Sequence, residues 1–345
     1  MTNHREMPPE LEAKREAKRF FSGIGLSVLL FILVTELATA LIVYITQQTF
    51  PKVISTWWYS RGLNVVSIYG IGLPVLMLAL RRVPVAPVSG LEASAPRRKF
   101  GWFFLAVAVA FGYMYIGANI GQIALNILSA ITGHDYVYLL ESIVDKTPLW
   151  ATVLFAVILV PIGEELVFRK LLIDRMRRYG DTAAIFLSAL FFGLFHGNLH
   201  QLFYAFLVGL VLGYVYTRTG KLRFSVALHM VINLLCGVVI PRLTSLLPVK
   251  EFTALPTTEL PAFIMEHPLE VLGILLISAA TNALMTAAAV LTVVLCACRR
   301  LGLRKSQIPM SRDALFSAAL GSVGVAALIA FNVILIVLNM IRLSA

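Results

Sequence analysis

Apolar stretches of about 20 residues recur along this chain, and they constrain its fold more than any other feature. At a rise of about 1.5 Å per residue, a helix of that length crosses a hydrocarbon core of about 30 Å. Hydrophobic residues make up 59% of the 345 residues and charged residues only 14%, whereas a soluble domain has about 25% charged residues. A soluble globular protein is therefore excluded, and the sequence predicts an all-α, polytopic membrane protein.

Breaks rich in charge, proline or glycine separate the apolar runs. About eight to nine transmembrane helices are expected, near residues 20–46, 63–80, 100–131, 149–178, 182–197, 201–217, 222–240, 269–296 and 314–341. We divide the chain into N-terminal helices at 1–148, a four-helix catalytic core at 149–240 and C-terminal helices at 241–345.

Positive charge gathers on one of the two alternating sets of helix ends. The chain has 29 Lys and Arg against 18 Asp and Glu, and most of the cations follow this pattern, for example Lys14, Arg81, Arg175 and Arg218. Because cytoplasmic loops carry the excess of Lys and Arg, we expect a cytoplasmic N-terminus. The cations lie between apolar segments, so we expect no nucleic-acid partner. Short connections and the absence of an organellar targeting segment favour a multi-pass protein of a prokaryotic plasma membrane.

Two adjacent carboxylates and an arginine lie inside the run 149–178. An ionisable side chain within a span is costly and marks a candidate functional site. Glu165 and Arg169 are four residues apart, so they share a helix face and can form an ion pair. Glu164 points about 100° away and has no partner in the sequence, an arrangement that suits a general base. An open alternative places both glutamates among the cytoplasmic headgroups.

Two further polar pairs also have helical spacing. His196 and His200 are four residues apart, as are His229 and Asn233, so each pair is expected on one helix face. Each pair alone is weak, because transmembrane His and Asn side chains often only bond to a neighbouring helix. We interpret His200 as a packing residue.

A length argument indicates that the glutamate and a histidine meet. If 149–178 and 182–197 form an antiparallel hairpin that turns near Gly180, Glu164 and His196 each lie 16 residues from the turn. Both would then lie about 24 Å from it, at one level of the membrane.

Together these residues resemble those of the CPBP family. The motifs are Glu164-Glu165-x-x-x-Arg169, Phe192-x-x-x-His196 and His229-x-x-x-Asn233. The family comprises CAAX proteases and bacteriocin-processing, Abi-type intramembrane proteases, and it includes the type II CAAX prenyl endopeptidases. The resemblance covers about residues 149–240.

The resemblance implies an all-helical membrane endopeptidase. Glu164 with His196 would activate water for attack on a peptide carbonyl, and His229 with Asn233 would stabilise the oxyanion. The implied partners are the lipid bilayer and a membrane-embedded or lipid-anchored peptide or protein substrate. Whether the substrates are prenylated is left open.

The need for a metal is also left open. The family's first Glu and two His have been treated as zinc ligands, which here would be Glu164, His196 and His229. A Glu, two His and a water would satisfy a catalytic zinc site. A glutamate base with imidazole and carboxamide donors needs no metal.

Two other functions remain as alternatives. In an ion-coupled transporter the same polar residues would form a proton relay or a substrate site. In a non-catalytic immunity or partner protein the fold would persist without activity. No internal repeat is visible to support a transporter, and every motif position is intact, which disfavours a degenerate protein.

Overall fold

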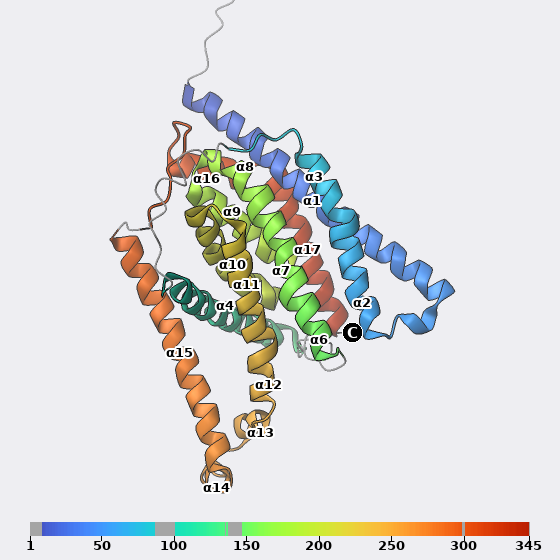
Figure 1. The fold of residues 1–345 in the computed structure, drawn as a ribbon, viewed down its shortest axis with the longest axis vertical. Coiled ribbons are helices and arrows are strands. Elements are labelled where there is room, and N and C mark those ends of the chain that lie inside the picture. Colours follow the sequence, from blue (N-terminus) through green and yellow to red (C-terminus); the bar gives the residue numbers. More distant parts are fainter. Residues whose placement is uncertain (1–8, 87–100, 135, 137–146, 299–300, 345) are drawn as a thin grey trace, which may run out of the picture.

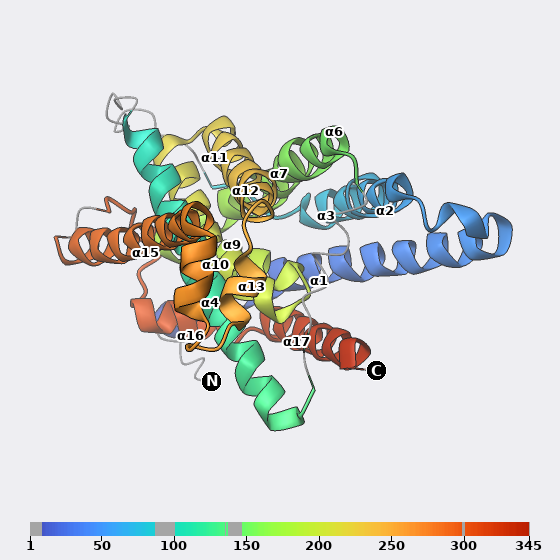
Figure 2. The same cartoon turned by 90° about the horizontal axis from the view of Figure 1, so that it is seen from below.

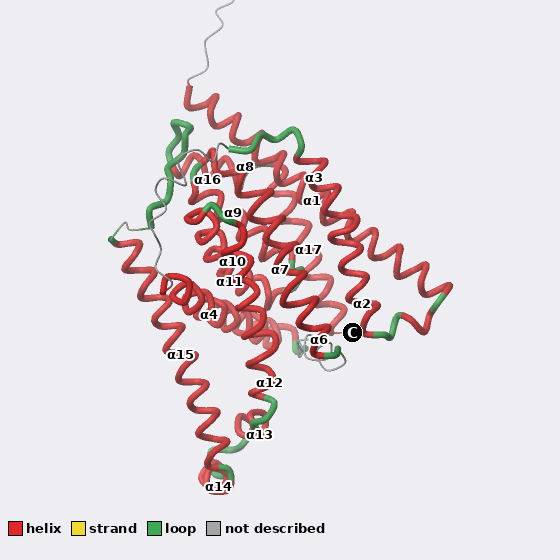
Figure 3. The backbone as a smooth tube through the Cα atoms, viewed as in Figure 1, coloured by secondary structure: helices red, strands yellow, loops and turns green. Residues whose placement is uncertain are grey.

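The computed structural model describes residues 9–86, 101–134, 136, 147–298 and 301–344. This part of the chain is helical and contains no strand (Figure 3). Eight of its helices are long and apolar enough to cross a membrane. In chain order they are α1 (Pro9–Thr49), α2 to α3 (Trp57–Leu80), α4 (Gly101–Thr132), α6 to η6 (Leu149–Tyr179), α10 (Leu199–Thr219), α11 to α12 (Leu222–Thr244), α15 (Pro268–Ala297) and α17 (Val323–Ser344).

The shorter helices show where the sequence prediction differs from the structure. They are η1 (Pro51–Val53), α9 (Asp181–Phe195), α13 (Val249–Ala254), α14 (Leu260–Glu266) and α16 (Arg312–Leu320). The predicted span 182–197 is α9, whose 15 residues fall short of the roughly 20 that a span needs. The predicted helix 314–341 is broken between α16 and α17, where the Ser322 hydroxyl donates to the Ala319 carbonyl and so competes with the helix backbone.

The helices that carry the candidate residues lie at the centre of the molecule (Figures 1 and 2). α10 packs against both α9 and α4, and α11 packs against α10 and α7. On one side α1 packs against α17, and on the other α15 packs against α4. In Figure 1, α15 stands apart from the central helices, with α14 at its lower end.

The helix from Leu149 to Tyr179 is irregular around the glutamate pair. The α-helical segment α7 (Val160–Glu165) lies between two π-helical stretches, η4 (Val153–Leu159) and η5 (Leu166–Ile173). Pro161, in the first turn of α7, has no N–H to donate. π-Helical turns widen a helix and are frequent at functional sites, and here they flank the segment that presents Glu164 and Glu165.

The predicted hairpin at Gly180 is present, but the chain turns a second time, directly after His196. Gly180 has a φ of 95° between η6 (Arg177–Tyr179) and α9. Gly197 has a φ of 64°, a left-handed conformation that glycine adopts without steric cost. Asn198 then caps α10 by accepting from the Gln201 N–H. The expectation that His196 and His200 share one helix face is therefore wrong, because this turn places them on different helices.

Candidate functional site

A buried ion pair forms the base of the site. Arg169 Nε lies 3.3 Å from Glu165 Oε2, and both side chains are fully buried. The Arg169 guanidinium also donates to the Gly209 carbonyl at 3.4 Å and lies 4.7 Å from the centre of the Phe192 ring. The pair therefore lies inside the protein and not on its surface.

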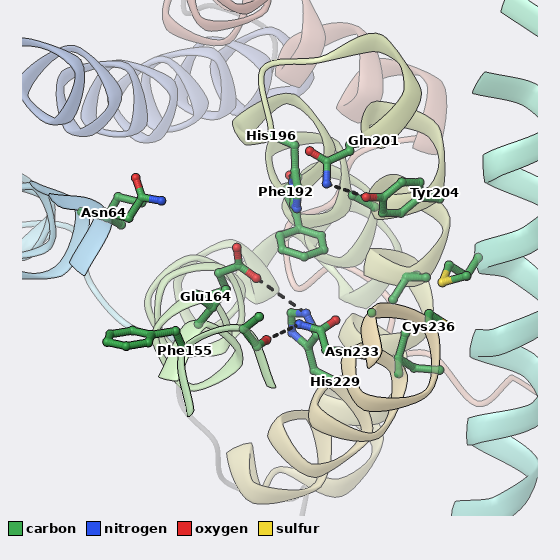
Figure 4. A pocket seen from close by; sticks show the side chains of 18 of the residues that line it. Asn64, Phe155, Glu164, Phe192, His196, Gln201, Tyr204, His229, Asn233 and Cys236 are labelled. Atoms are coloured by element: carbon green, nitrogen blue, oxygen red, sulfur yellow. Dashed lines mark hydrogen bonds and ion pairs between the residues drawn. The ribbon is translucent and has the colours of Figure 1, made fainter. Parts of the chain in front are cut away.

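His229 lies between the two glutamates. Its Nδ1 is 3.1 Å from Glu165 Oε1. Its Nε2 is 3.6 Å from Glu164 Oε2, a contact that Figure 4 shows. Arg169 balances the charge of one carboxylate. An imidazolium at His229 would supply a second positive charge and so balance the other carboxylate.

Asn233 lies one turn after His229 on α11 (Leu222–Leu234) and contacts the helix that carries Glu164 and Glu165. Its Nδ2 donates to the Ala156 carbonyl at 2.9 Å. His229 and Asn233 therefore face one neighbouring helix, as their spacing predicts. A carboxamide nitrogen carries two hydrogens, so one donor of Asn233 remains for a ligand.

His196 ends α9 with its ring orientation fixed. Its Nδ1 is 2.8 Å from the Phe192 carbonyl. A carbonyl oxygen can only accept, so Nδ1 carries the hydrogen, and in the neutral ring Nε2 is then an acceptor. The Phe192 ring lies edge-on to both histidine rings, with centroid separations of 4.9 Å to His196 and 5.7 Å to His229.

The candidate residues fall into two groups, according to whether they line a cavity of about 590 Å³. Glu164, His196, His229 and Asn233 line its wall (Figure 4). Glu165 and Arg169 lie behind this wall, in contact with His229 and Phe192 rather than with the cavity. The four lining residues can therefore meet a ligand, whereas Glu165 and Arg169 can act only through their neighbours.

Comparison with known proteins finds one family match. Residues 146–235 match the family described as type II CAAX prenyl endopeptidase, Rce1-like. This segment is therefore similar to an Rce1-like domain. The matched segment contains both groups of candidate residues, while the helices before and after it lie outside the match. No curated protein and no solved structure matches the chain.

The side chains of the matched segment do not fit the zinc site that the family resemblance left open. The sequence suggests Glu164, His196 and His229 as ligands, but in the described part of the chain no three His, Cys, Asp or Glu side chains lie where they could hold one ion. His229 has a carboxylate near each ring nitrogen, and His196 Nδ1 is hydrogen-bonded to a backbone carbonyl.

Several cavity residues escape sequence reasoning because they come from other helices or carry no motif. They are Arg61, Asn64, Tyr69, Gln201, Tyr204 and Cys236. The Tyr69 hydroxyl donates to the Val160 carbonyl at 3.2 Å, and Gln201 Nε2 donates to the Tyr204 hydroxyl (Figure 4). One sequence feature could have indicated the position of Tyr69. Gly163, next to Glu164, has no side chain and so leaves room for an aromatic ring from another helix.

Proposed function

We propose that this protein is an intramembrane endopeptidase that hydrolyses peptide bonds of membrane-associated substrates. The observation that carries the proposal is a carboxylate, Glu164, in the wall of a cavity that His196 and His229 also line. Hydrolysis inside a membrane needs a base, hydrogen-bond donors for the oxyanion and space for substrate and water. The Rce1-like family match supports the same reaction.

In the proposed reaction Glu164 takes a proton from water while the water oxygen adds to the carbonyl carbon. His196 orients this water through Nε2. The negative charge on the carbonyl oxygen is stabilised by the Nε2–H of His229, as an imidazolium, and by the remaining carboxamide N–H of Asn233. The proton then passes to the amide nitrogen as the C–N bond breaks, which leaves one new carboxyl and one new amine terminus.

Glu165 and Arg169 act as positioning residues in this proposal. Glu165 accepts from His229 Nδ1 at 3.1 Å, and so it fixes the plane of the imidazole ring. Arg169 in turn holds Glu165 from the opposite side. The pair determines where the His229 donors point.

The proposed substrates are membrane-embedded or lipid-anchored peptides and proteins in a prokaryotic plasma membrane. The cavity presents more apolar than polar surface, with Phe155, Val160 and Ile232 among its lining residues, and it suits a substrate segment of low polarity. The name of the matched family points to prenylated peptides as the first probes.

The test compares newly formed peptide termini in membranes of cells that express the wild type or Glu164→Gln at equal levels. The matched control is Glu36→Gln, which changes a carboxylate in α1 that is exposed on the protein surface, outside the cavity. Termini present with the wild type and the control but absent with Glu164→Gln support the proposal. The same termini in all three samples contradict it and return attention to transport or a non-catalytic partner role.

A further inference from the structure

A cavity of about 970 Å³ lies away from the candidate site, beside the turn at Gly180. Its walls include the start of α9, the segment 301–310 and the start of α16. The cations Arg304, Lys305 and Arg312 line it, and no Asp or Glu is among the described residues that do so. We call this cavity the basic pocket.

The three cations of the basic pocket are not neutralised by the protein. Among the residues that the structure describes, no carboxylate lies within ion-pair distance of any of them. Asp181, in the wall behind the pocket, is already paired with Arg177 at 2.9 Å. The pocket therefore presents positive charge that an anionic ligand can balance.

The segment 301–310 is held in place through its backbone. Tyr214 and Arg218 of α10 each donate to a backbone carbonyl of the segment. The Arg304 N–H donates to the Asp181 carboxylate at 3.0 Å, and the Arg304 carbonyl accepts from the Asp181 N–H at 3.1 Å. Because these contacts do not use the side chains of the segment's two cations, those side chains are available to a ligand at a wall that is already formed, which lowers the cost of binding.

The position and the lining of the basic pocket favour a phosphate group that belongs to a lipid. α16 and the start of α1 lie at the same end of the molecule (Figure 1), the end that we expect on the cytoplasmic side. Basic pockets between membrane helices on that side bind anionic lipid headgroups. Apolar residues in the same wall offer a surface to the start of an acyl chain. They are Leu301, Leu303, Ile308, Met310, Leu315 and Phe316.

We propose that the basic pocket binds the phosphate of an anionic lipid headgroup, with the first part of the acyl chains against the apolar wall. The inference is independent of the proposed function, because the pocket shares no lining residue with the cavity of Glu164. The bound lipid would lie against the turn at Gly180, which joins the helix of Glu164 to α9. A soluble phosphate offers the same oxygens, and the experiment separates the two sources.

The test measures lipid binding to the purified full-length protein in detergent by native mass spectrometry. The probes are phosphatidylglycerol, which is anionic, and phosphatidylcholine with the same acyl chains. For the wild type we expect phosphatidylglycerol to bind about 10- to 100-fold more tightly, because each cation near a lipid headgroup adds to the attraction. The combined variant Arg304→Gln, Lys305→Gln and Arg312→Gln should bind both lipids equally.

The matched control is the combined variant Arg15→Gln, Lys18→Gln and Arg19→Gln. It removes two arginines and one lysine from exposed positions near the start of α1, outside the pocket, and should keep the preference of the wild type. If the pocket variant does not fold, Arg312→Gln alone replaces it, since this side chain is exposed at the start of α16. We expect Arg312→Gln to weaken binding of phosphatidylglycerol about fivefold.

Three outcomes overturn the inference. The first is an unchanged preference for phosphatidylglycerol in the pocket variant. The second is an equal loss in the pocket variant and the control, which would assign the preference to the general surface charge. The third is displacement of phosphatidylglycerol by inorganic phosphate at the same concentration, which would assign the pocket to a soluble phosphate rather than to a lipid.

Discussion

At the scale of single residues, the two adjacent glutamates have different surroundings. Glu164 faces the cavity, whereas Glu165 is fully buried between Arg169 and His229. The i,i+4 spacing predicted the Glu165–Arg169 pair because both partners lie on one helix. The position of His229 between both carboxylates could not be predicted, because a contact across 64 residues leaves no local pattern in the sequence.

The Glu165–Arg169 pair leads to a prediction about stability. Arg169→Ala should lower the free energy of unfolding by about 3–5 kcal/mol, because it leaves a buried carboxylate without its cation. The double variant Glu165→Gln with Arg169→Met should recover much of this loss, since it removes both charges. Unfolding of the detergent-solubilised protein by titration with a denaturing detergent measures the difference.

Glu164→Gln serves as the matched control for that measurement. It changes the neighbouring carboxylate, which faces the cavity and whose nearest charged partner, His229 Nε2, is 3.6 Å away. We therefore expect little change in stability from Glu164→Gln. Equal destabilisation by Glu164→Gln and Arg169→Ala would contradict the division between a cavity residue and a positioning pair.

At the scale of elements, the sequence predicted the long helices and the turn at Gly180 but missed the irregularity of the helix that carries the two glutamates. Hydrophobic periodicity reports which face of a helix is buried, so it did not reveal the π-helical stretches around α7. The turn at Gly197 falls at the predicted break between 182–197 and 201–217, but the spacing of His196 and His200 wrongly predicted that they share one helix face. Its consequence, the separation of His196 from His200, depends on one left-handed glycine.

The approach of α7 to the second span depends on Gly163. A Cβ at this position would lie 2.1 Å from Tyr69 Cε1, so Gly163→Ala must move the ring or the helix that carries Glu164. We expect a loss of about 1–3 kcal/mol from overpacking together with reduced peptide cleavage. Tyr69→Ala added to Gly163→Ala should restore much of the stability by making room.

Gly23→Ala is the control for this overpacking, because a Cβ at Gly23 in α1 would have no atom within 4 Å. Both substitutions replace a helical glycine by alanine and gain the same helix propensity. Thermal unfolding in detergent should therefore separate them. If Gly163→Ala were as stable and as active as Gly23→Ala, the close contact with Tyr69 would not shape the site.

At the scale of the whole molecule, the alternation of positive charge agrees with the arrangement of the helices. The start of α1, the end of α3, α8 (Asp174–Met176) and α16 lie at one end of the molecule, and the C-terminus lies toward the other (Figure 1). Basic residues such as Lys18, Arg81 and Arg175 belong to the first end. The count of spans was predicted to within one helix, because α9 is too short to be counted by length.

The predicted orientation can be tested on α1 alone. Lys18 and Gln48 are exposed residues near its two ends, about 45 Å apart along the helix. In a variant without native cysteines, a membrane-impermeant maleimide should label Gln48→Cys in intact cells and Lys18→Cys only after permeabilisation. The opposite labelling pattern would contradict a cytoplasmic N-terminus, because it would place the basic ends outside the cell.

The central claim is that Glu164 activates water for hydrolysis of a peptide bond. The most direct measurement incubates purified, reconstituted protein with a prenylated peptide in water enriched in heavy oxygen and follows the products by mass spectrometry. We predict that the wild type releases a fragment with heavy oxygen in its new carboxyl group and that Glu164→Gln, folded and reconstituted to the same level, releases none. The same labelled product from Glu164→Gln would contradict the account.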